Sequence, residues 1–278
     1  MAILLILDFS GTLSIAAVQF GTPEYLARAL QESGLAALGV DETVYWREIV
    51  TPTWEEGSTS TVGLTNLIAR RVCAIGGAPE PAYQAAQRFT QMYMAASAID
   101  PAWQSLFDAV RSIPTVIPLI ATDHYAEATL QITTQLTALG WQAASLRVRR
   151  GHCRAIAQYK ATRPYAIVPG TLFNHRYTAL IANSADLGVI KATPRFWQWV
   201  RMALGVQPLR IVLVDDFGAS ENLADFYANP ERVTHRRQQT VAALQRVFAA
   251  SIQTVQFVLD HPLDRTVTEV TELIRRYQ

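Results

Sequence analysis

Cysteine and lysine are scarce in this chain of 278 residues, which has two of each. The cysteines, Cys73 and Cys153, stand alone and far apart in the sequence. That excludes a disulfide framework and a cysteine metal site, and it favours a reducing compartment. No apolar run approaches the ~20 residues of a membrane-spanning helix. The opening "MAILLIL" lacks the basic start and the small-residue cleavage site of a signal peptide. We therefore expect a cytoplasmic protein with no membrane partner.

Acidic residues are absent between Glu127 and Asp186, whereas the first hundred residues lean acidic. We interpret residues 145–177 as a basic insertion within the core. It can form an electropositive wall that attracts phosphorylated substrate or nucleic acid, or its arginines can pair with acidic groups of this chain or of another subunit. The net charge is only +1 and there is no glycine–aromatic RNA-binding signature, so nucleic acid is not an expected partner. The sequence does not indicate whether the protein is a monomer or an oligomer. The basic residues of this stretch are Arg147, Arg149, Arg150, Arg154, Lys160, Arg163 and Arg176.

Half of the residues are hydrophobic, and several of them form short apolar runs that end at polar residues. Such runs are typical of parallel strands that helices bury on both faces. Helix-patterned segments such as "PAWQSLFDAVRSI" and "TPRFWQWVRMALG" separate the runs. This alternation predicts an α/β fold with a parallel, Rossmann-like sheet. The expected strands are "AILLILD" (2–8), "TVIPLIATD" (115–123), "YTALIAN" (177–183), "RIVLVDD" (210–216) and "TVQFVLD" (254–260).

Residues 15–100 follow a different pattern. Segments such as "TPEYLARALQESGLAAL", "TVGLTNLIARRVCAI" and "PAYQAAQRFTQMYMAASAI" have helical periodicity, with no convincing strand between them. We interpret them as an all-helical domain inserted directly after the first strand. The core domain is then formed by residues 1–14 and 101–278.

Polar and charged side chains stand where three of the expected strands end. Asp8 follows the first strand, Thr122 closes the second, and Asp215 and Asp216 close the strand "RIVLVDD". In an open parallel sheet ligands bind outside the carboxyl ends of the strands, so these side chains converge if the strands are neighbours. Lys191, just before a predicted helix, adds a cation. A nucleophile, a hydroxyl, a cation and two metal-binding carboxylates are the parts that phosphoryl transfer needs.

Taken together and in order, four segments resemble the four motifs of the haloacid dehalogenase (HAD) superfamily. They are "LLILDFSGTL", "IPLIATD", "SADLGVIKATPRFWQWV" and "LRIVLVDDFGASENLADF". The helical insertion occupies the place of that superfamily's first type of cap. The resemblance implies a HAD-like Rossmannoid core with an all-α cap, and a hydrolase, most readily a phosphatase of a small phosphorylated metabolite.

The resemblance also implies a role for each motif residue. Asp8 would be the nucleophile that forms an aspartyl-phosphate. Thr122 would hydrogen-bond the transferred group, and Lys191 would offset its charge. Mg²⁺ would be the cofactor, held by Asp8, the backbone carbonyl of Ser10, Asp215 and Asp216. The residues expected at the substrate are Gly11, Thr12, Asp123 and His124, with Thr12 orienting the loop.

Ser10 is the point at which the sequence departs from the phosphatases of that superfamily, which carry a second aspartate two residues after the nucleophile. That aspartate protonates the leaving group and then activates water, which contributes ~10²–10⁴-fold to the rate. A serine hydroxyl cannot replace it directly, although the backbone oxygen at this position still can bind a cation. The metal-free dehalogenases are disfavoured by the retained Asp215–Asp216 pair. Phosphonate hydrolases are disfavoured because the insertion has no lysine, and P-type pumps because membrane spans are lacking.

Two functions therefore stay open. The first is a phosphohydrolase whose leaving-group proton comes from His124, from the helical insertion or from the substrate. The second is a catalytically impaired, phosphate-binding or regulatory protein. A carboxylate or histidine within reach of Ser10 favours the first. His124 can equally be a simple loop residue, and Trp46 and Trp54 can either line a substrate pocket or belong to the core of the insertion.

Overall fold

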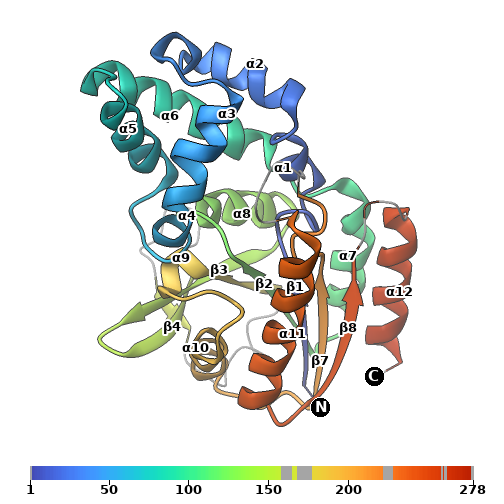
Figure 1. The fold of residues 1–278 in the computed structure, drawn as a ribbon. Helices are drawn as coiled ribbons and strands as arrows, with labels where there is room; N and C mark the ends of the chain where they lie inside the picture. Colours follow the sequence, from blue (N-terminus) through green and yellow to red (C-terminus); the bar gives the residue numbers. More distant parts are fainter. Residues whose placement is uncertain are drawn as a thin grey trace.

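A mostly parallel β-sheet forms the centre of the computed structural model (Figure 1). Its described strands run in the order β5-β4-β3-β6-β2-β1-β7-β8, and β4 and β5 are antiparallel to their neighbours. The structure describes residues 2–157, 165–167, 177–221, 228–257, 259 and 262–276. The strands are β1 (Ile3–Leu7), β2 (Val116–Thr122), β3 (Gln142–Arg149), β4 (His152–Ala157), β5 (Tyr165–Ile167), β6 (Thr178–Asn183), β7 (Arg210–Asp215) and β8 (Ser251–Gln256).

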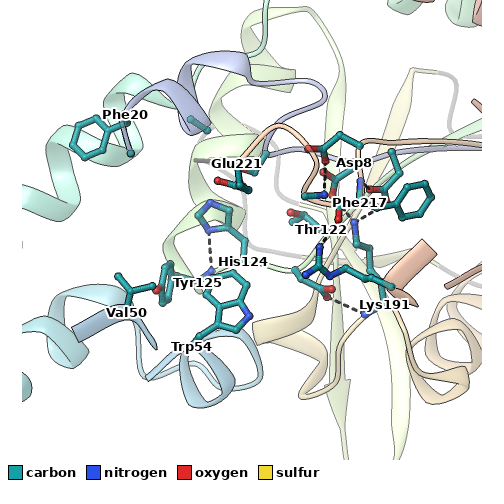
Figure 2. A pocket seen from close by; sticks show the side chains of 18 of the residues that line it. Asp8, Phe20, Val50, Trp54, Thr122, His124, Tyr125, Lys191, Phe217 and Glu221 are labelled. Atoms are coloured by element: carbon teal, nitrogen blue, oxygen red, sulfur yellow. Dashed lines mark hydrogen bonds and ion pairs between the residues drawn. The ribbon is translucent and has the colours of Figure 1, made fainter. Parts of the chain in front are cut away.

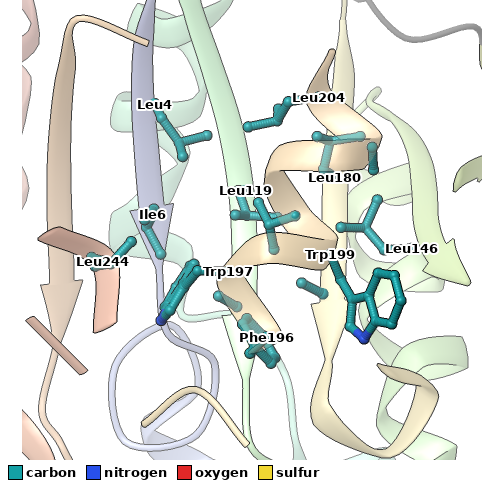
Figure 3. Packing of buried hydrophobic residues seen from close by; sticks show 14 of the residues in the cluster. Leu4, Ile6, Leu119, Leu146, Leu180, Phe196, Trp197, Trp199, Leu204 and Leu244 are labelled. Atoms are coloured by element: carbon teal, nitrogen blue, oxygen red, sulfur yellow. The ribbon is translucent and has the colours of Figure 1, made fainter. Parts of the chain in front are cut away.

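The central strands are buried on both faces, which explains their unbroken apolar runs. Successive side chains of a strand point to opposite faces. Leu4 and Ile6 of β1 therefore pack in one cluster with Trp197 and Leu244 (Figure 3), whereas Leu5 belongs to the cluster on the other face. Because polar residues cannot be accommodated on either side, the run "ILLIL" continues until the chain leaves the sheet at its carboxyl edge.

Helices cover both faces of the sheet. α10 (Pro194–Leu204) and α11 (Pro230–Val247) pack on one face. α7 (Gln104–Ser112), α8 (Glu127–Ala138) and α12 (Leu263–Arg275) pack on the other. Two short helices complete this part, η3 (Pro101–Trp103) and α9 (Ser184–Leu187). No helix among the described residues is long and apolar enough to cross a membrane.

Between β1 and η3 the chain is helical, and these helices lie over the carboxyl end of the central strands (Figure 1). They have an apolar cluster of their own, which includes Leu30, Leu67 and Phe89 and also takes in Tyr125 from the chain after β2. The helices are α1 (Ile15–Gln19), α2 (Pro23–Ser33), η1 (Ala36–Leu38), α3 (Glu42–Val44), η2 (Tyr45–Val50), α4 (Thr51–Ser58), α5 (Leu64–Ala74) and α6 (Pro79–Ala96).

The continuous helix α3–η2–α4 contains a π-helical turn with a cause in the sequence. The Thr51 N–H donates to the carbonyl of Trp46, five residues earlier, as in a π-turn. Pro52 has no N–H, so the carbonyl of Glu48, four residues before it, lacks its helical donor. Arg71 of α5 supplies one instead, with Nε 2.5 Å from that oxygen. The widened turn contributes side chains to the cavity described below.

The basic segment is part of the sheet over its described residues. β3 begins at Gln142, so the predicted boundary at residue 145 falls inside a strand. β3 pairs in parallel with β6 and turns through Gly151 into antiparallel β4, which interrupts the expected βα alternation. Arg147 forms an ion pair with the buried Asp186. Of the other basic residues, Lys160, Arg163 and Arg176 lie outside the described residues.

The last strand differs from its prediction. β8 covers Ser251–Gln256, three residues earlier than the expected start at 254, and residues 258 and 260 lie outside the described part. β8 is the last strand in the described order and is only partly buried, with Val255 its one buried residue, so its start carries no continuous apolar run.

Candidate active site

Three of the predicted site residues meet at one edge of the sheet. β2 and β7 flank β1, and Leu7 is in register with a residue of each neighbour. Asp8, Thr122 and Asp215 therefore emerge side by side at the carboxyl ends, and all three are buried. The Asp8 N–H continues the pairing by donating to the Val214 carbonyl at 2.9 Å. The sheet thus fixes the spacing of these side chains.

Asp8, Asp215 and Asp216 form a buried carboxylate cluster, in which one oxygen of each lies within 4.8 Å of the others. Lys191 Nζ donates to Asp8 Oδ1 at 2.5 Å and to Asp215 Oδ2 at 2.9 Å. Burial raises the pKa of Asp8 well above its usual range, against the lowering effect of Lys191. Burial, together with Asp215, raises the pKa of Asp216 to about 6. One ammonium against three carboxylates leaves the cluster short of positive charge.

The loop after β1 is shaped by its contact with Asp216. Gly11 has φ +75°, and a Cβ atom there would lie 2.5 Å from Asp216 Oδ2. The Thr12 hydroxyl accepts the Asp216 N–H at 3.1 Å, and its carbonyl accepts Trp103 Nε1 at 3.1 Å. Gly11 and Thr12 are not among the described residues that line the cavity. Their observed contacts hold the loop in place, and none of these contacts supports a direct place at the substrate.

The turn after β7 fixes the other two carboxylates. The Phe217 N–H donates to Asp215 Oδ1 at 2.7 Å, and Phe217 itself has φ 56°, a conformation uncommon outside glycine. The Gly218 and Ser220 N–H groups donate to the two oxygens of Asp216 at 3.1 and 2.9 Å. These bonds orient both carboxylates before any ligand is bound.

Lys191 is held by its own backbone as well as by its side chain. Its N–H donates to Asp123 Oδ1 at 2.9 Å, and its carbonyl accepts Trp197 Nε1 at 2.7 Å. Burial raises the pKa of Asp123, while Lys191 acts in the opposite direction. In the structure, Asp123 therefore contacts the backbone of Lys191 and helps to position that residue.

Two buried hydroxyls at the site have no hydrogen-bond partner among the described residues. They are Thr122 Oγ1, at the end of β2, and Thr240 Oγ1, on α11. Buried polar atoms are nearly always bonded, so an orphaned one calls for an explanation. Both threonines line the same cavity as the carboxylate cluster, where a bound ligand can accept their hydrogen bonds.

A carboxylate that the sequence analysis missed lies beside Ser10. Ser10 Oγ donates to Glu221 Oε1 at 3.2 Å, and both residues line the cavity. Glu221 lies six residues after Asp215, in a turn, and no hydrophobic periodicity marks its position. Its closeness to the loop after β1 depends on the fold, which brings residues 10 and 221 together.

His124 is buried and uncharged near neutral pH. Burial lowers its pKa from 6.5 to about 4. Nδ1 accepts the Tyr125 N–H at 2.8 Å, so Nε2 carries the proton and donates to Tyr93 OH at 3.2 Å. The ring also stacks on Tyr93, with centroids 5.7 Å apart. This arrangement makes His124 a flat wall of the cavity and a poor proton donor at pH 7.

The carboxylate cluster forms one wall of a cavity of about 80 Å³ between the sheet and the helices over it. Phe20, Val50 and Trp54 lie on the opposite side from Asp8 and Lys191 (Figure 2). Of the predicted site residues, the cavity brings together Asp8, Ser10, Thr122, Asp123, His124, Lys191, Asp215 and Asp216. Trp46 and Trp54 line it while also packing against the helical cluster. The lining residues that were not predicted include Glu221, Arg236, Thr240, Phe20, Tyr93 and Tyr125.

Comparison with solved structures supports the fold. The structure is similar to a 2-haloacid dehalogenase from Pseudomonas syringae pv. Tomato DC3000, with a TM-score of 0.55 and 14% sequence identity over 100% of both chains. A predicted HAD-like family hydrolase from Porphyromonas gingivalis matches with a TM-score of 0.46 and 13% identity, over 99% of this chain and 98% of that one. No protein-family model and no curated protein matches the sequence. The predicted α/β fold class is confirmed.

Proposed function

We propose that this chain is a Mg²⁺-dependent hydrolase of the HAD superfamily that cleaves a phosphomonoester through an aspartyl-phosphate at Asp8. The observation that carries the proposal is the buried cluster of Asp8, Asp215 and Asp216, with Lys191 bonded to two of them at the carboxyl edge of the sheet. The unpartnered Thr122 hydroxyl stands at the same edge. An attacking carboxylate, a fixed cation and a hydrogen-bond donor are what positioning and charge stabilisation of a phosphoryl group require.

The charges of the cavity fit a divalent cation. Five carboxylates and two cationic side chains line it, a formal balance of −3, which repels a phosphate dianion. Asp8, Asp215 and Asp216, with the Ser10 carbonyl, offer the oxygen ligands that Mg²⁺ prefers. When bound, Mg²⁺ would supply the positive charge that offsets repulsion between these carboxylates and the phosphoryl oxygens. It would also favour the ionised form of Asp8, whose pKa is otherwise raised.

The proposed reaction has two halves. In the first, a carboxylate oxygen of Asp8 bonds to phosphorus as the bond from phosphorus to the alcohol oxygen breaks, and the alcohol leaves with a proton. In the second, water attacks the phosphorus of the aspartyl-phosphate and loses a proton, which releases Asp8 and inorganic phosphate. Lys191 offsets the charge on Asp8, and the Thr122 hydroxyl donates to a phosphoryl oxygen throughout.

The proton that the alcohol takes up, and that water later gives up, needs a carrier. Ser10 cannot serve, and neutral His124 has too low a pKa for an acid at pH 7. Glu221, hydrogen-bonded to Ser10 and lining the cavity, places a carboxylate beside the position from which the second aspartate of the superfamily's phosphatases acts. We assign the proton transfer to Glu221.

Halide displacement, the reaction named for the similar dehalogenase, is the neighbouring alternative. It requires an ionised Asp8, whereas burial, together with Asp215 and Asp216, raises the pKa of Asp8. Two extra buried carboxylates work against that reaction unless a cation is bound. The cluster therefore favours phosphoryl transfer. A second candidate, a catalytically impaired phosphate-binding or regulatory protein, is favoured by Ser10 itself and disfavoured by the carboxylate found next to it.

Phosphate release from acetyl phosphate and 4-nitrophenyl phosphate tests the proposal. Both have leaving groups that need little proton assistance, so turnover depends on Asp8 and the cation. We expect turnover with Mg²⁺, its loss on adding a chelator, and its loss in Asp8→Asn. If the natural protein releases no phosphate from either substrate and only Ser10→Asp does, the protein is the catalytically impaired one of the second candidate. If chloride release from a 2-chloro acid without Mg²⁺ is the activity found, the phosphohydrolase proposal is wrong.

A further inference from the structure

We propose that the alcohol part of the substrate carries a single flat, apolar ring, which the helices of residues 15–96 hold against His124. This inference rests on the proposed function and names its substrate class. It starts from a division of the cavity lining. The sheet edge, the loops next to it and α11 contribute all of the charged lining residues, and the helices of residues 15–96 contribute the lining from the opposite side.

The helical side of the cavity has no charged residue and no carboxamide among the described residues. It is built from Ala17, Leu26 and Val50 together with aromatic rings. A polyhydroxylated alcohol, such as that of a sugar phosphate, needs several hydrogen-bond partners for its hydroxyls. Each one buried without a partner costs binding free energy. This wall therefore weakens the binding of such substrates and strengthens the binding of apolar ones.

The aromatic side chains of the wall are arranged to contact a ring. Phe20, Tyr93 and His124 form a series, with centroids 5.2 Å apart for the first pair and 5.7 Å for the second. Trp54 meets Tyr125 edge to face at 5.4 Å. Flat rings at these spacings pack further rings in offset or edge-to-face contacts. Because His124 is neutral, it takes part as an uncharged ring.

One polar atom in this wall has no partner to satisfy it. Trp46 Nε1 is buried and makes no hydrogen bond with any described residue, although Trp46 lines the cavity. A buried indole N–H normally finds an acceptor. A ring that carries a single acceptor, such as a hydroxyl, methoxy or ring-nitrogen group, would provide it. The wall thus admits one acceptor on an otherwise apolar ring.

The cavity is small. Its volume is about 80 Å³, whereas an engineered apolar cavity that binds benzene has ~150 Å³. Binding of even one ring therefore requires the cavity to widen, and a fused ring system or a nucleoside requires it to widen further. A separate open groove of about 470 Å³ shares Trp54, Asp123 and Arg236 with the cavity, and Arg232 and His235 also line it. A large polar substrate would have to use that groove instead.

The test compares primary-alkyl phosphates with similar leaving groups, so that intrinsic reactivity does not decide the result. Benzyl phosphate carries the flat ring, cyclohexylmethyl phosphate an apolar ring that is not flat, and glucose 6-phosphate a polar one. Acetyl phosphate measures the chemistry without any ring. We expect kcat/KM for benzyl phosphate to exceed that for glucose 6-phosphate by ~100-fold, as burial of one aromatic ring predicts, and to exceed that for cyclohexylmethyl phosphate by about 10-fold.

A pair of variants on one helix provides the matched control. Tyr93 and Tyr83 are both on α6, but Tyr93 lines the cavity and Tyr83 is 44% exposed. We expect Tyr93→Leu to lower the preference for benzyl over glucose 6-phosphate by about 10-fold, and Tyr83→Leu to leave both that preference and acetyl phosphate turnover unchanged. Calorimetric binding of benzylphosphonate and methylphosphonate to Asp8→Asn gives a readout that needs no turnover, with the benzyl compound expected to bind more tightly.

Failure of this inference can be told apart from failure of the proposed function. If acetyl phosphate is turned over but glucose 6-phosphate equals or exceeds benzyl phosphate, the ring inference is wrong and the hydrolase stands. A loss of that glucose 6-phosphate activity in Arg232→Ala would then locate the substrate in the outer groove. If no phosphate ester is turned over, the proposed function is wrong. In that case equal binding of the two phosphonates overturns the ring inference as well, and tighter binding of the benzyl compound retains it for a binding protein.

Discussion

Ser10 Oγ donates a hydrogen bond to Glu221 Oε1 at 3.2 Å, across 211 positions of the sequence. The loop after β1 and the turn after β7 are brought together by the parallel pairing of these strands. Position 10 itself carries no carboxylate, but the fold places the carboxylate of Glu221 next to it. The proposed mechanism assigns proton transfer to Glu221 for this reason, since both loops face the same cavity.

Replacing Glu221 tests that inference directly. We expect Glu221→Gln to lower kcat for benzyl phosphate by ~10²–10³-fold, because its alkoxide leaving group needs a proton. The effect on 4-nitrophenyl phosphate should be less than about 10-fold during formation of the aspartyl-phosphate, since nitrophenolate leaves without one. Rapid-mixing measurement of the nitrophenol burst separates that step from hydrolysis of the intermediate.

The matched control is Glu269→Gln, an exposed carboxylate on α12, which should behave as the natural protein. In the double variant Ser10→Asp/Glu221→Gln, kcat for benzyl phosphate should recover by at least 10-fold, because a carboxylate again reaches the leaving group. An equal loss of activity on both substrates in Glu221→Gln would instead show that the residue only holds Ser10 in place.

His124 predicts how stability depends on pH. Its pKa is about 4 in the folded protein and ~6.5 when exposed, so the unfolded chain binds more protons between these values. The contribution of neutral His124 is therefore fully present above pH 6.5 and is lost as the pH falls towards 4. It amounts to about 3 kcal/mol at most. We expect His124→Gln to lose less unfolding free energy than the natural protein between pH 7 and pH 4.5.

Denaturant unfolding at several pH values, with the metal removed by a chelator, measures this difference. The comparison must be made between variants because Asp8 and Asp216 act in the opposite direction. Their raised pKa values make the folded, metal-free protein bind more protons than the unfolded chain, which favours folding at lower pH. These two carboxylates are common to both proteins and cancel. If the free energy of unfolding changes with pH in the same way in both proteins, the assignment of a neutral, buried His124 is contradicted.

The sequence was sufficient to predict the strands that carry the carboxylate cluster. Buried parallel strands leave continuous apolar runs, and the first polar residue after each run marks the carboxyl edge of the sheet. Asp8, Thr122 and Asp215 were located in this way. The prediction required β1, β2 and β7 to be neighbours, which the register confirms.

Other parts of the site leave no such signal. Glu221 lies in a turn without periodicity, and its relation to Ser10 exists only in three dimensions. Tyr93 and Tyr83 are both tyrosines of α6, and only packing decides which of them faces the cavity. The antiparallel turn from β3 to β4 also breaks the βα alternation from which the strands were predicted, so no strand was expected between residues 142 and 157.

Gly11 is the position where backbone conformation and the proposed metal site depend on each other. It has φ +75°, and an added Cβ would lie 2.5 Å from Asp216 Oδ2, much closer than any ordinary contact. Asp216 cannot move away without losing the N–H donors of Gly218 and Ser220. A side chain at position 11 should therefore displace a carboxylate that we assign to the cation.

Gly11→Ala is expected to weaken Mg²⁺ binding at least 10-fold and to lower the unfolding free energy by about 1–3 kcal/mol, the sum of the left-handed conformation and the displaced carboxylate. Gly39→Ala is the control, because Gly39 has φ +82° but nothing within 4 Å of an added Cβ. It should show a conformational cost of ~1 kcal/mol with unchanged Mg²⁺ affinity. Calorimetric Mg²⁺ titration and denaturant unfolding of both variants separate the two effects. If both variants bind Mg²⁺ as tightly as the natural protein, Asp216 is not a ligand in the way proposed, and the cation must be held without it.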